Sequence, residues 1–524
     1  MFRQAVRRNP NKLPTGILES IPAPDEGWDA VSPLTDMDPK RAIIIDNLTP
    51  RPGYLELRKG SFSWATGLGG NVETLLVWRG STEKMFGAAA GTIWDITATG
   101  AASATTITGQ TNDRYQSVNF SNTAGNFIVA VNGADPAVNF DGTTWATSPA
   151  ITGVSSGTLI DIWAHKKRLY FVQKDSLKVW YLSIAAIGGA AQQFDLGPIF
   201  TEGGTILCTG TWTFDGGNGV DDYWVVITDQ GEVAIYQGDD PASASTWALV
   251  GTYRIGFPLS RRSILKTGGD LAVITSDGIV PLSAALRTDR TASGRIALSA
   301  RIQNEFVKAV SAYKSNFGWD GLSYPKGNLA IFNIPVVGSV LSYQYVVNVL
   351  TGAWGRWLGQ NAFCWEIFND RLYFGAASGI VFEADKGSTD NGTAITADLK
   401  CAFNYFKRHG QRKKFTMIRP IIRTDSTVMP AIEMNVDYEE RVPTATPTVT
   451  LPTATGLWDV GLWDVATWGD SLVVRNDWTG CNGIGVCGAV RMRIIGTAGS
   501  ASIPVDTIVQ VIGFDVIYES GGYV

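Results

Sequence analysis

The sequence has only two histidines, His165 and His409, in 524 residues. Histidine is the usual general base and a common metal ligand, so its scarcity argues against chemistry that depends on an imidazole. Cysteine is also sparse. The five cysteines include no Cys-x-x-Cys pair, which argues against a disulfide scaffold or a zinc ribbon. Only Cys481 and Cys487 are close enough for a local disulfide, and two reduced thiols are the alternative. We expect neither a metal nor a cofactor.

Long apolar runs are missing as well. No segment reaches the roughly 20 apolar residues that a bilayer span requires. The amino terminus, MFRQAVRRNPNKLPTG, is basic but has no apolar region of the kind found in secretion signals. We therefore expect a soluble protein with no membrane span. The net charge of −5 argues against a protein that binds nucleic acid by neutralising phosphates.

Aromatic residues and glycine are abundant. The chain has 18 tryptophans and 58 glycines among many short runs of Val, Ile and Thr, and 45% of its residues are apolar. Such a composition supports large cores and many turns, which is typical of an all-β protein.

The word RLYF occurs twice, in KKRLYFVQKDSLKVWYL and in DRLYFGAASGIVFEAD. It marks a repeated unit in which an apolar run is followed by a polar turn and a second apolar run. Spacings between successive copies range from 42 to 58 residues. Seven copies begin at Met85, Phe127, Leu169, Tyr223, Leu271, Leu329 and Leu372.

Repeats of this length, built from short antiparallel strands, are typical of a β-propeller in which each unit is one four-stranded blade. A single hairpin cannot bury its apolar face, whereas stacked blades cover one another. We expect about six or seven blades. A tandem of β-sandwiches is the alternative, and it would explain the uneven spacings. One helix is expected in RIQNEFVKAVSAYKS, where Ile302, Phe306, Val310 and Tyr313 recur at helical spacing; we expect it to pack on a blade.

Three domains are expected. Residues 1–70 are rich in proline and have little periodicity, which predicts an extended N-terminal arm. Residues 71–388 form the propeller, and residues 389–524 form an additional C-terminal β domain. That domain contains the Pro/Thr run VPTATPTVTLPTATG and then GLWDVGLWDVATWGD. The spacing of five residues between Trp458, Trp463 and Trp468 fits neither helix nor strand, so we expect these indoles to dock a loop onto a subunit or partner interface.

Basic residues gather in two places. Arg3, Arg7 and Arg8 lie near the amino terminus, where they could reach an acidic partner or remain solvated. The run FKRHGQRKKF predicts a hairpin with a strongly cationic tip. This hairpin could be a solvated turn, or it could contact a neighbouring subunit or DNA. Its cations are Lys407, Arg408, Arg412, Lys413 and Lys414.

Several segments resemble the tail proteins of short-tailed bacteriophages. These are GWDAVSPLTDMDPKRAIIIDNLTPRPGYLELRKG, GTYRIGFPLSRRSILKTGGDLAVITSDGIVPLS, QYVVNVLTGAWGRW, WDVGLWDVATWGD and VIGFDVIYESGG. The resemblance implies a structural virion protein, the tail hub or nozzle, which forms a six-fold ring below the portal and its adaptor. It further implies contacts with the adaptor and with tail fibres or spikes, and passage of double-stranded DNA without sequence recognition. The protein would be made in the host cytoplasm and reside in the virion tail. The resemblance supplies no catalytic residues.

Two motifs for chemistry are weak. GVSSG places Ser155 in a Gly-x-Ser-x-Gly pattern. A catalytic serine in this pattern needs a strand before it and a helix after it, whereas Ser155 lies in a Ser/Thr/Gly-rich stretch that predicts a loop. GGNGVDDYW, Gly216 to Trp224, matches a single copy of a calcium-binding repeat that works only in stacks. The alternative function is a propeller that hydrolyses or binds glycans. A hydrolase would need two facing carboxylates; loop candidates are Asp221, Asp222, Asp239 and Asp240.

Overall fold

The computed structural model describes residues 16–215, 220–288, 290–337, 341–425, 427–444, 448–450, 472–495 and 507–523. The chain divides into two compact units. The first spans residues 59–393, and the second joins the residues up to 58 to most of those from 394 onward.

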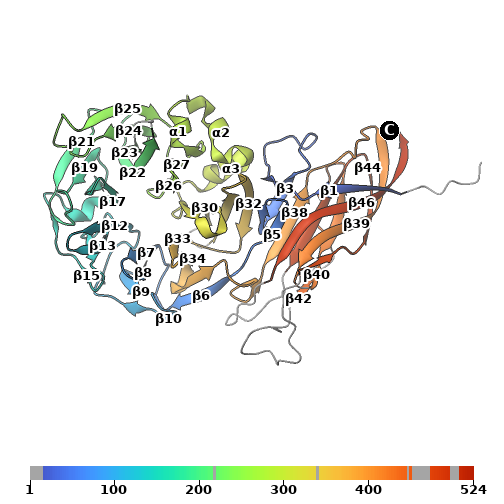
Figure 1. The fold of residues 1–524 in the computed structure, drawn as a ribbon, viewed down its shortest axis with the longest axis horizontal. Coiled ribbons are helices and arrows are strands. Elements are labelled where there is room, and N and C mark those ends of the chain that lie inside the picture. The colour runs from blue at the N-terminus through green and yellow to red at the C-terminus, as the bar shows by residue number, and fades with distance from the viewer. Residues whose placement is uncertain are drawn as a thin grey trace, which may run out of the picture. The chain divides into compact units, whose positions relative to one another are not determined.

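Short antiparallel sheets arranged around a common centre make up the first unit (Figure 1). In the described part of this unit, four sheets of four strands and one of three stand separately. Their strands are β7 (Thr74–Arg79), β8 (Glu83–Ala89), β9 (Thr92–Asp95), β11 (Ser103–Ala104); β12 (Gln116–Asn122), β13 (Gly125–Val131), β14 (Val138–Phe140), β15 (Trp145–Ala146); β17 (Leu159–His165), β18 (Arg168–Gln173), β19 (Lys178–Tyr181), β21 (Gln192–Asp195); β22 (Ile206–Asp215), β23 (Val220–Thr228), β24 (Glu232–Gln237), β25 (Ala248–Arg254); β26 (Ile264–Thr267), β27 (Asp270–Thr275) and β28 (Gly278–Pro281).

Two more antiparallel groups follow. The first is β29 (Asp320–Tyr324), β30 (Leu329–Val337), β31 (Leu341–Asn348) and β32 (Ala353–Leu358). The second is β33 (Cys364–Phe368), β34 (Arg371–Gly375), β35 (Val381–Ala384) and β6 (Ser61–Thr66). Because β6 comes from the start of the unit and pairs with β35 from its end, this sheet ties the two ends of the unit together. Short strands beside these sheets are β10 (Gly100–Ala101), β16 (Ile151–Thr152), β20 (Gly189–Ala190), β36 (Thr389–Asp390) and β37 (Thr393–Ala394).

The first strands of these groups form a closed ring. Strands β7, β12, β17, β22, β26, β29 and β33 each contact the next, and β33 contacts β7. Antiparallel sheets set radially around such a ring make a β-propeller, which confirms the all-β propeller architecture expected from the repeat.

The repeat found in the sequence corresponds to the second strand of each group. The two copies of RLYF lie in β18 and β34. Both of these strands are buried over most of their length, because neighbouring sheets cover both of their faces. The turn in TDQGE needs its glycine: Gly231 has a φ of +79°, and a Cβ there would lie 2.4 Å from the Ile255 carbonyl oxygen.

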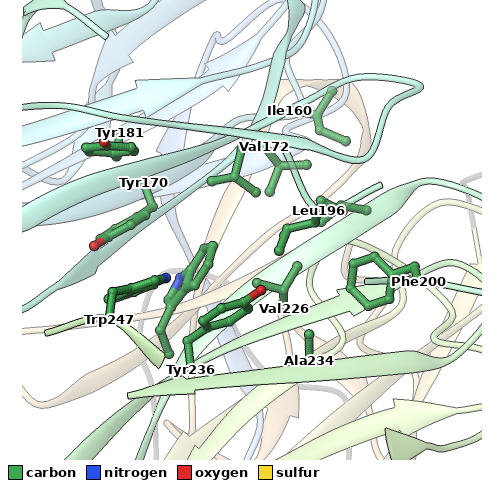
Figure 2. Packing of buried hydrophobic residues seen from close by; sticks show 13 residues of the cluster. Ile160, Tyr170, Val172, Tyr181, Leu196, Phe200, Val226, Ala234, Tyr236 and Trp247 are labelled. Atoms are coloured by element: carbon green, nitrogen blue, oxygen red, sulfur yellow. The ribbon is translucent and has the colours of Figure 1, made fainter. Parts of the chain in front are cut away.

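Aromatic side chains fill the space between sheets. Figure 2 shows Tyr170 and Tyr181 from one sheet facing Tyr236 and Trp247 from the next. The rings of Tyr170 and Trp224 have centroids 4.8 Å apart, and those of Tyr236 and Trp247 are stacked at 5.4 Å. Offset aromatic pairs of this kind add to the free energy gained from burial. The abundance of tryptophan and tyrosine therefore reflects packing between sheets.

Helices interrupt the strands between β28 and β29. They are α1 (Leu282–Ala285), α2 (Ser293–Ile296) and α3 (Gln303–Tyr313), with 3₁₀ turns at η2 (Arg290–Ala292) and η3 (Leu298–Ile302). Elsewhere in the unit, 3₁₀ turns occur at η1 (Ser156–Thr158), η4 (Pro325–Gly327) and η5 (Ala377–Gly379). The expected helix is α3, in which Phe306 and Val310 are buried. It packs on the β29–β32 sheet, and the Tyr345 hydroxyl donates to the Glu305 carbonyl at 3.4 Å. The short helices α1 and α2 were not expected.

Two sheets form the second unit. One contains β2 (Gly27–Trp28), β3 (Arg41–Asp46), β38 (Thr396–Cys401), β45 (Gly488–Ile495) and β41 (Ala431–Val436). The other, which we call the long-strand sheet, contains β1 (Ile17–Pro22), β4 (Leu48–Arg51), β5 (Tyr54–Leu57), β39 (Gln411–Thr424), β43 (Val473–Arg475), β44 (Thr479–Gly485) and β46 (Val509–Tyr523). A separate two-stranded sheet, made of β40 (Thr427–Met429) and β42 (Thr448–Thr450), also belongs to the described part of this unit. The two sheets pack closely, since a Cβ at Gly488 would lie 2.9 Å from the Phe415 ring.

The expected N-terminal arm is wrong for the described residues of that segment. Strand β1 pairs with β46, β3 pairs with β38, and β5 pairs with β46, so residues 17–57 belong to a sheet unit completed by the C-terminal residues. Residues 61–66 belong to the propeller instead. The expected boundaries at 70 and 388 therefore shift to 58 and 393. Local periodicity could not reveal this, because the pairing partners lie hundreds of residues away in sequence.

All five cysteines are free thiols, so Cys481 and Cys487 do not form a bridge. Over the described ranges, no helix is both long and apolar enough to cross a membrane.

Candidate functional site

The centre of the propeller contains a chain of cavities lined by the first strands. Because β7, β12, β17, β22, β26, β29 and β33 form one ring, their side chains converge on its axis. Three cavities follow one another there, with volumes of about 480, 220 and 440 Å³. Neighbouring cavities share lining residues. These sizes suit small molecules rather than macromolecules.

The middle cavity holds three carboxyl groups, Asp161 on β17, Asp320 on β29 and Glu366 on β33. Asp161 accepts hydrogen bonds from the Thr209 amide at 2.9 Å and the Thr209 hydroxyl at 3.4 Å. Glu366 accepts from the Ile367 amide at 3.0 Å and lies 3.5 Å from Arg79. We call this space the carboxyl cavity.

Burial dominates the protonation of these acids. It raises the pKa of Asp161 to about 7, although the Thr209 amide opposes the change. Burial likewise raises the pKa of Glu366 to about 7 and raises that of Asp320. Carboxyl groups with a pKa near neutrality can exchange protons at physiological pH, as general acids and bases do. The adjacent Cys364 is a poor nucleophile, because burial raises the pKa of its thiol to about 12.

One arginine closes the axis at the end where the first strands begin. Arg262 lies just before β26 and crosses to the opposite side of the ring. Its guanidinium donates to the Glu73 carbonyl at 3.1 Å, the Thr74 hydroxyl at 2.7 Å and the Tyr115 carbonyl at 3.1 Å. It therefore links the segment before β26 to β7 and to the residue that precedes β12.

The cavity beside Arg262 is the largest of the three, at about 480 Å³. We call it the cationic cavity. Phe317 lies under two guanidinium groups, 4.0 Å from that of Arg114 and 5.4 Å from that of Arg262. The lining consists of Arg114, Gln116, Leu207, Leu259, Ser260, Arg261, Arg262, Lys314, Ser315, Asn316, Phe317 and Trp319.

The third cavity, at the ends of the first strands, includes His165. Its Nδ1 is 3.1 Å from the Thr211 hydroxyl, which also accepts a hydrogen bond from Trp163. Burial lowers the pKa of His165 to about 4, so the ring is neutral at physiological pH. Within the part of the chain that the structure describes, no group of three or more His, Cys, Asp or Glu residues is placed to hold a metal ion.

The predicted site residues fall into two classes. Arg3, Arg7, Arg8, Trp458, Trp463 and Trp468 lie outside the described residues. Part of the glycine-rich segment with the weak calcium motif, residues 216–219, lies outside them too. The cations at 407–414 are described, but they do not form a hairpin. Strand β38 pairs with β3 and β45, whereas β39 pairs with β43, β44 and β46, so residues 402–410 connect the two sheets of the second unit.

Lys413 is not part of an exposed cationic tip. Its side chain is 0% exposed, and its ammonium donates to the carbonyls of Arg408, Gln411 and Val486 at 2.7, 3.1 and 2.7 Å. Alternation along β39 explains this, because Lys413 shares the inward face with Phe415. Lys407, Arg408, Arg412 and Lys414 are exposed, and Lys414 lies 3.8 Å from Glu519.

Two of the carboxylates considered for hydrolysis are bound to other side chains. Asp240 forms an ion pair with Arg168 at 3.2 Å, and Asp222, which lies on β23 and not in a loop, accepts from the Thr213 hydroxyl at 2.7 Å. Ser155 precedes a 3₁₀ turn that leads directly into β17, which is not a strand-to-helix elbow. Sequence reasoning missed the axial residues. The only signal was the pair Arg261 and Arg262 before an apolar strand, a pattern too short to indicate a site.

No family model matches the chain, and no curated protein matches it. Similar solved structures include the β-propeller domain of Cps50 (Swd1) from Myceliophteria thermophila, at 12% identity and a TM-score of 0.39, covering 63% of this chain and 99% of that one. YCF48 bound to D1 peptide is similar at 11% identity and a TM-score of 0.33, covering 64% and 96%. BBS1N in complex with ARL6DN is similar at 12% identity and a TM-score of 0.30, covering 44% and 73%. We draw no function from these likenesses.

Proposed function

We propose that this chain is a structural component of the tail of a short-tailed bacteriophage. It would form the tail hub or nozzle, a six-fold ring that continues the DNA exit channel below the portal and its adaptor and that anchors tail fibres or spikes. The segments that carry the resemblance come from both units: residues 27–60 include β2 to β5, residues 251–283 include β26 to β28, and residues 511–522 lie in β46.

The observation that best supports assembly is the outer face of the long-strand sheet. Leu18 on β1 is opposite Ile517 on β46, which is opposite Met417 on β39, so the three side chains form one row. Leu18 is 56% exposed and Met417 is 37% exposed, and Ile484 on the neighbouring β44 is 62% exposed. Exposed apolar side chains gathered on one sheet face are typical of surfaces that contact another protein.

Charged pairs lie beside this row. Arg419 binds Asp515, which also accepts a hydrogen bond from Ser20 at 2.6 Å. The Arg419 guanidinium also lies 4.8 Å from the Trp478 ring centroid. An apolar centre with a polar border and an arginine–tryptophan contact has the composition of a subunit interface. We therefore propose this face as the contact between copies or with the adaptor.

We further propose that the seven radial groups are seven blades. The axial cavities, about 220 to 480 Å³ each, are the size of small-molecule sites, and Arg262 lies across the axis where two of them meet. A DNA duplex would therefore pass through the centre of the subunit ring and not through a propeller. With a net charge of −5 per subunit, the ring would repel the duplex rather than hold it.

The decisive test of the proposal is the assembly state of the full chain, with and without its adaptor. Rings in electron micrographs would support it. A matched pair of variants tests the interface: Met417→Asp places a charge in the apolar row, whereas Arg475→Asp changes an exposed residue at the end of β43. We expect Met417→Asp to lose rings and Arg475→Asp to keep them. Equal ring yields would argue against this face.

A glycan hydrolase remains the second candidate, because Asp161 and Glu366 share the carboxyl cavity and both have a pKa of about 7. A pair of carboxyl groups is what glycoside hydrolysis requires. Reducing-sugar release from host envelope glycans, lost in the Asp161→Asn and Glu366→Gln variants, would establish this activity and displace the purely structural proposal.

A further inference from the structure

The cationic cavity has an unusual charge for this acidic chain. Four basic side chains line it, Arg114, Arg261, Arg262 and Lys314, and none of the described residues in its lining is an aspartate or glutamate. Among the described residues, Arg114 forms an ion pair with Glu73 through two contacts of 3.1 Å. The other three cations line a cavity of about 480 Å³, and two of them, Arg261 and Arg262, also line the carboxyl cavity on their other side.

Arg262 is held in place by acceptors that carry no charge. Its three close partners are two backbone carbonyls and the Thr74 hydroxyl. The loop before β26 is fixed as well, because the Ser263 hydroxyl accepts from the Ser260 amide at 2.8 Å and the Ser260 hydroxyl donates to the Trp319 carbonyl at 2.7 Å. The guanidinium is therefore oriented in advance, while its charge stays uncompensated by a direct ion pair.

Arg261 is only weakly hydrogen-bonded. Its hydrogen bond to the Ile160 carbonyl is 3.4 Å long. Burial lowers its pKa and Asp161 opposes the change; Arg262 and Arg114 lower the pKa further, and Asp175 opposes them. The Asp161 carboxyl is already bound to Thr209. Like charges gathered in a half-buried space repel one another, and a bound anion would relieve this repulsion. The guanidinium groups suit such an anion, because they bind carboxylates and phosphates through paired hydrogen bonds.

The rest of the lining fits an organic anion. Gln116, Ser260, Ser315 and Asn316 offer neutral hydrogen-bonding groups, and Phe317 offers a ring. The volume lies within the range of small-molecule sites, which combine apolar walls with a few polar groups.

We propose that the cationic cavity binds a small molecule bearing an oxyanion, either a carboxylate or a phosphate. Arg261 and Lys314 supply positive charge without a direct ion pair among the described residues, and Arg114 and Arg262 supply guanidinium groups 4.0 and 5.4 Å from the Phe317 ring centroid. This inference is independent of ring assembly, because the whole cavity lies within one propeller.

Isothermal titration calorimetry on the full chain at low salt tests it. The probes are inorganic phosphate, phenyl phosphate, glucuronate and, as the uncharged match for glucuronate, glucose. We expect saturable binding of at least one anion, weakened by added salt, and none of glucose. Phosphate or phenyl phosphate binding without glucuronate binding assigns a phosphate site, and the reverse assigns a carboxylate site. If none of the anions binds, or if glucose binds as well as glucuronate, the proposal is wrong.

Variants locate the site. Arg261→Gln and Lys314→Gln should each weaken anion binding by about tenfold, since a hydrogen bond to a charged group is lost or a charge is removed. Arg254→Gln is the matched control, because Arg254 is an exposed arginine paired with Glu202 outside the cavity. Lys314 is exposed just after α3, so Lys314→Gln should fold normally. This variant therefore tests the site even if Arg261→Gln fails to fold. Unchanged affinity in both variants, or an equal loss in Arg254→Gln, would overturn the assignment.

Discussion

Replacing Lys413 with methionine should destabilise the second unit far more than the same change at Lys414. Both residues lie on β39, but Lys413 is 0% exposed whereas the Lys414 side chain is 55% exposed. Methionine keeps most of the apolar stem and removes the ammonium. The carbonyls of Arg408, Gln411 and Val486 then lose their shared donor.

The size of the effect follows from those three contacts. Hydrogen bonds from a charged donor contribute about 1.5–3 kcal/mol each. The desolvation of the buried ammonium, which also lowers the pKa of Lys413, offsets part of that sum by several kcal/mol. We expect a net loss of about 2–4 kcal/mol for Lys413→Met. The Lys414–Glu519 pair at 3.8 Å is solvated, so Lys414→Met should change stability by no more than about 0.5 kcal/mol.

Hydrogen exchange of the β39 amides is the appropriate assay, because it reports the opening free energy of the second unit separately from the propeller. Urea unfolding of the full chain followed by circular dichroism provides a second measure. The reasoning fails if Lys413→Met and Lys414→Met exchange at the same rate, because buried and exposed lysines would then contribute equally.

Three further outcomes are expected. The pKa of Asp161, about 7, lies above its ordinary value, so the folded state keeps a proton that the unfolded state releases. The stability of the wild type therefore falls as pH rises from about 4 to about 7. In urea unfolding, the free energy of unfolding of Asp161→Asn should rise by about 1–3 kcal/mol relative to that of the wild type across this range. The pKa of His165, about 4, lies below its ordinary value, so the unfolded state binds the extra proton and stability falls as pH drops from about 6.5 to about 4. His165→Gln should make the free energy of unfolding less dependent on pH in this range. An unchanged pH dependence would contradict the burial argument. Arg262→Gln should lower the stability of the propeller by about 2–4 kcal/mol, measured by thermal unfolding, and Arg254→Gln should not.

The propeller could be predicted from the sequence because most of its sheets are local units; the pairing of β6 with β35 is the exception described above. The apolar run that begins at Leu169 and the one at Leu372 are both second strands, and their turns are encoded within a few residues. Helix α3 was predictable for the same reason, since Phe306 and Val310 lie on one helical face. Local patterns need no information about distant partners.

The site could not be predicted because it is assembled from distant positions. Asp161, Asp320 and Glu366 meet only when the ring closes, and Arg262 binds Thr74 across a sequence separation of 188 residues. The pairing of β1 with β46 is hidden in the same way and misled the expectation of an arm. The burial of Lys413 was readable in principle, because it alternates with Arg412 and Lys414 on a strand that also carries Phe415.

The central claim is that the chain works as a subunit of a ring. Electron microscopy of the purified full chain, mixed with the tail adaptor and compared with the chain alone, tests it most directly. We expect closed rings with six copies around an open channel, and we expect Met417→Asp to lose them. A protein that stays monomeric under both conditions, while releasing reducing sugar from host glycans, would contradict it.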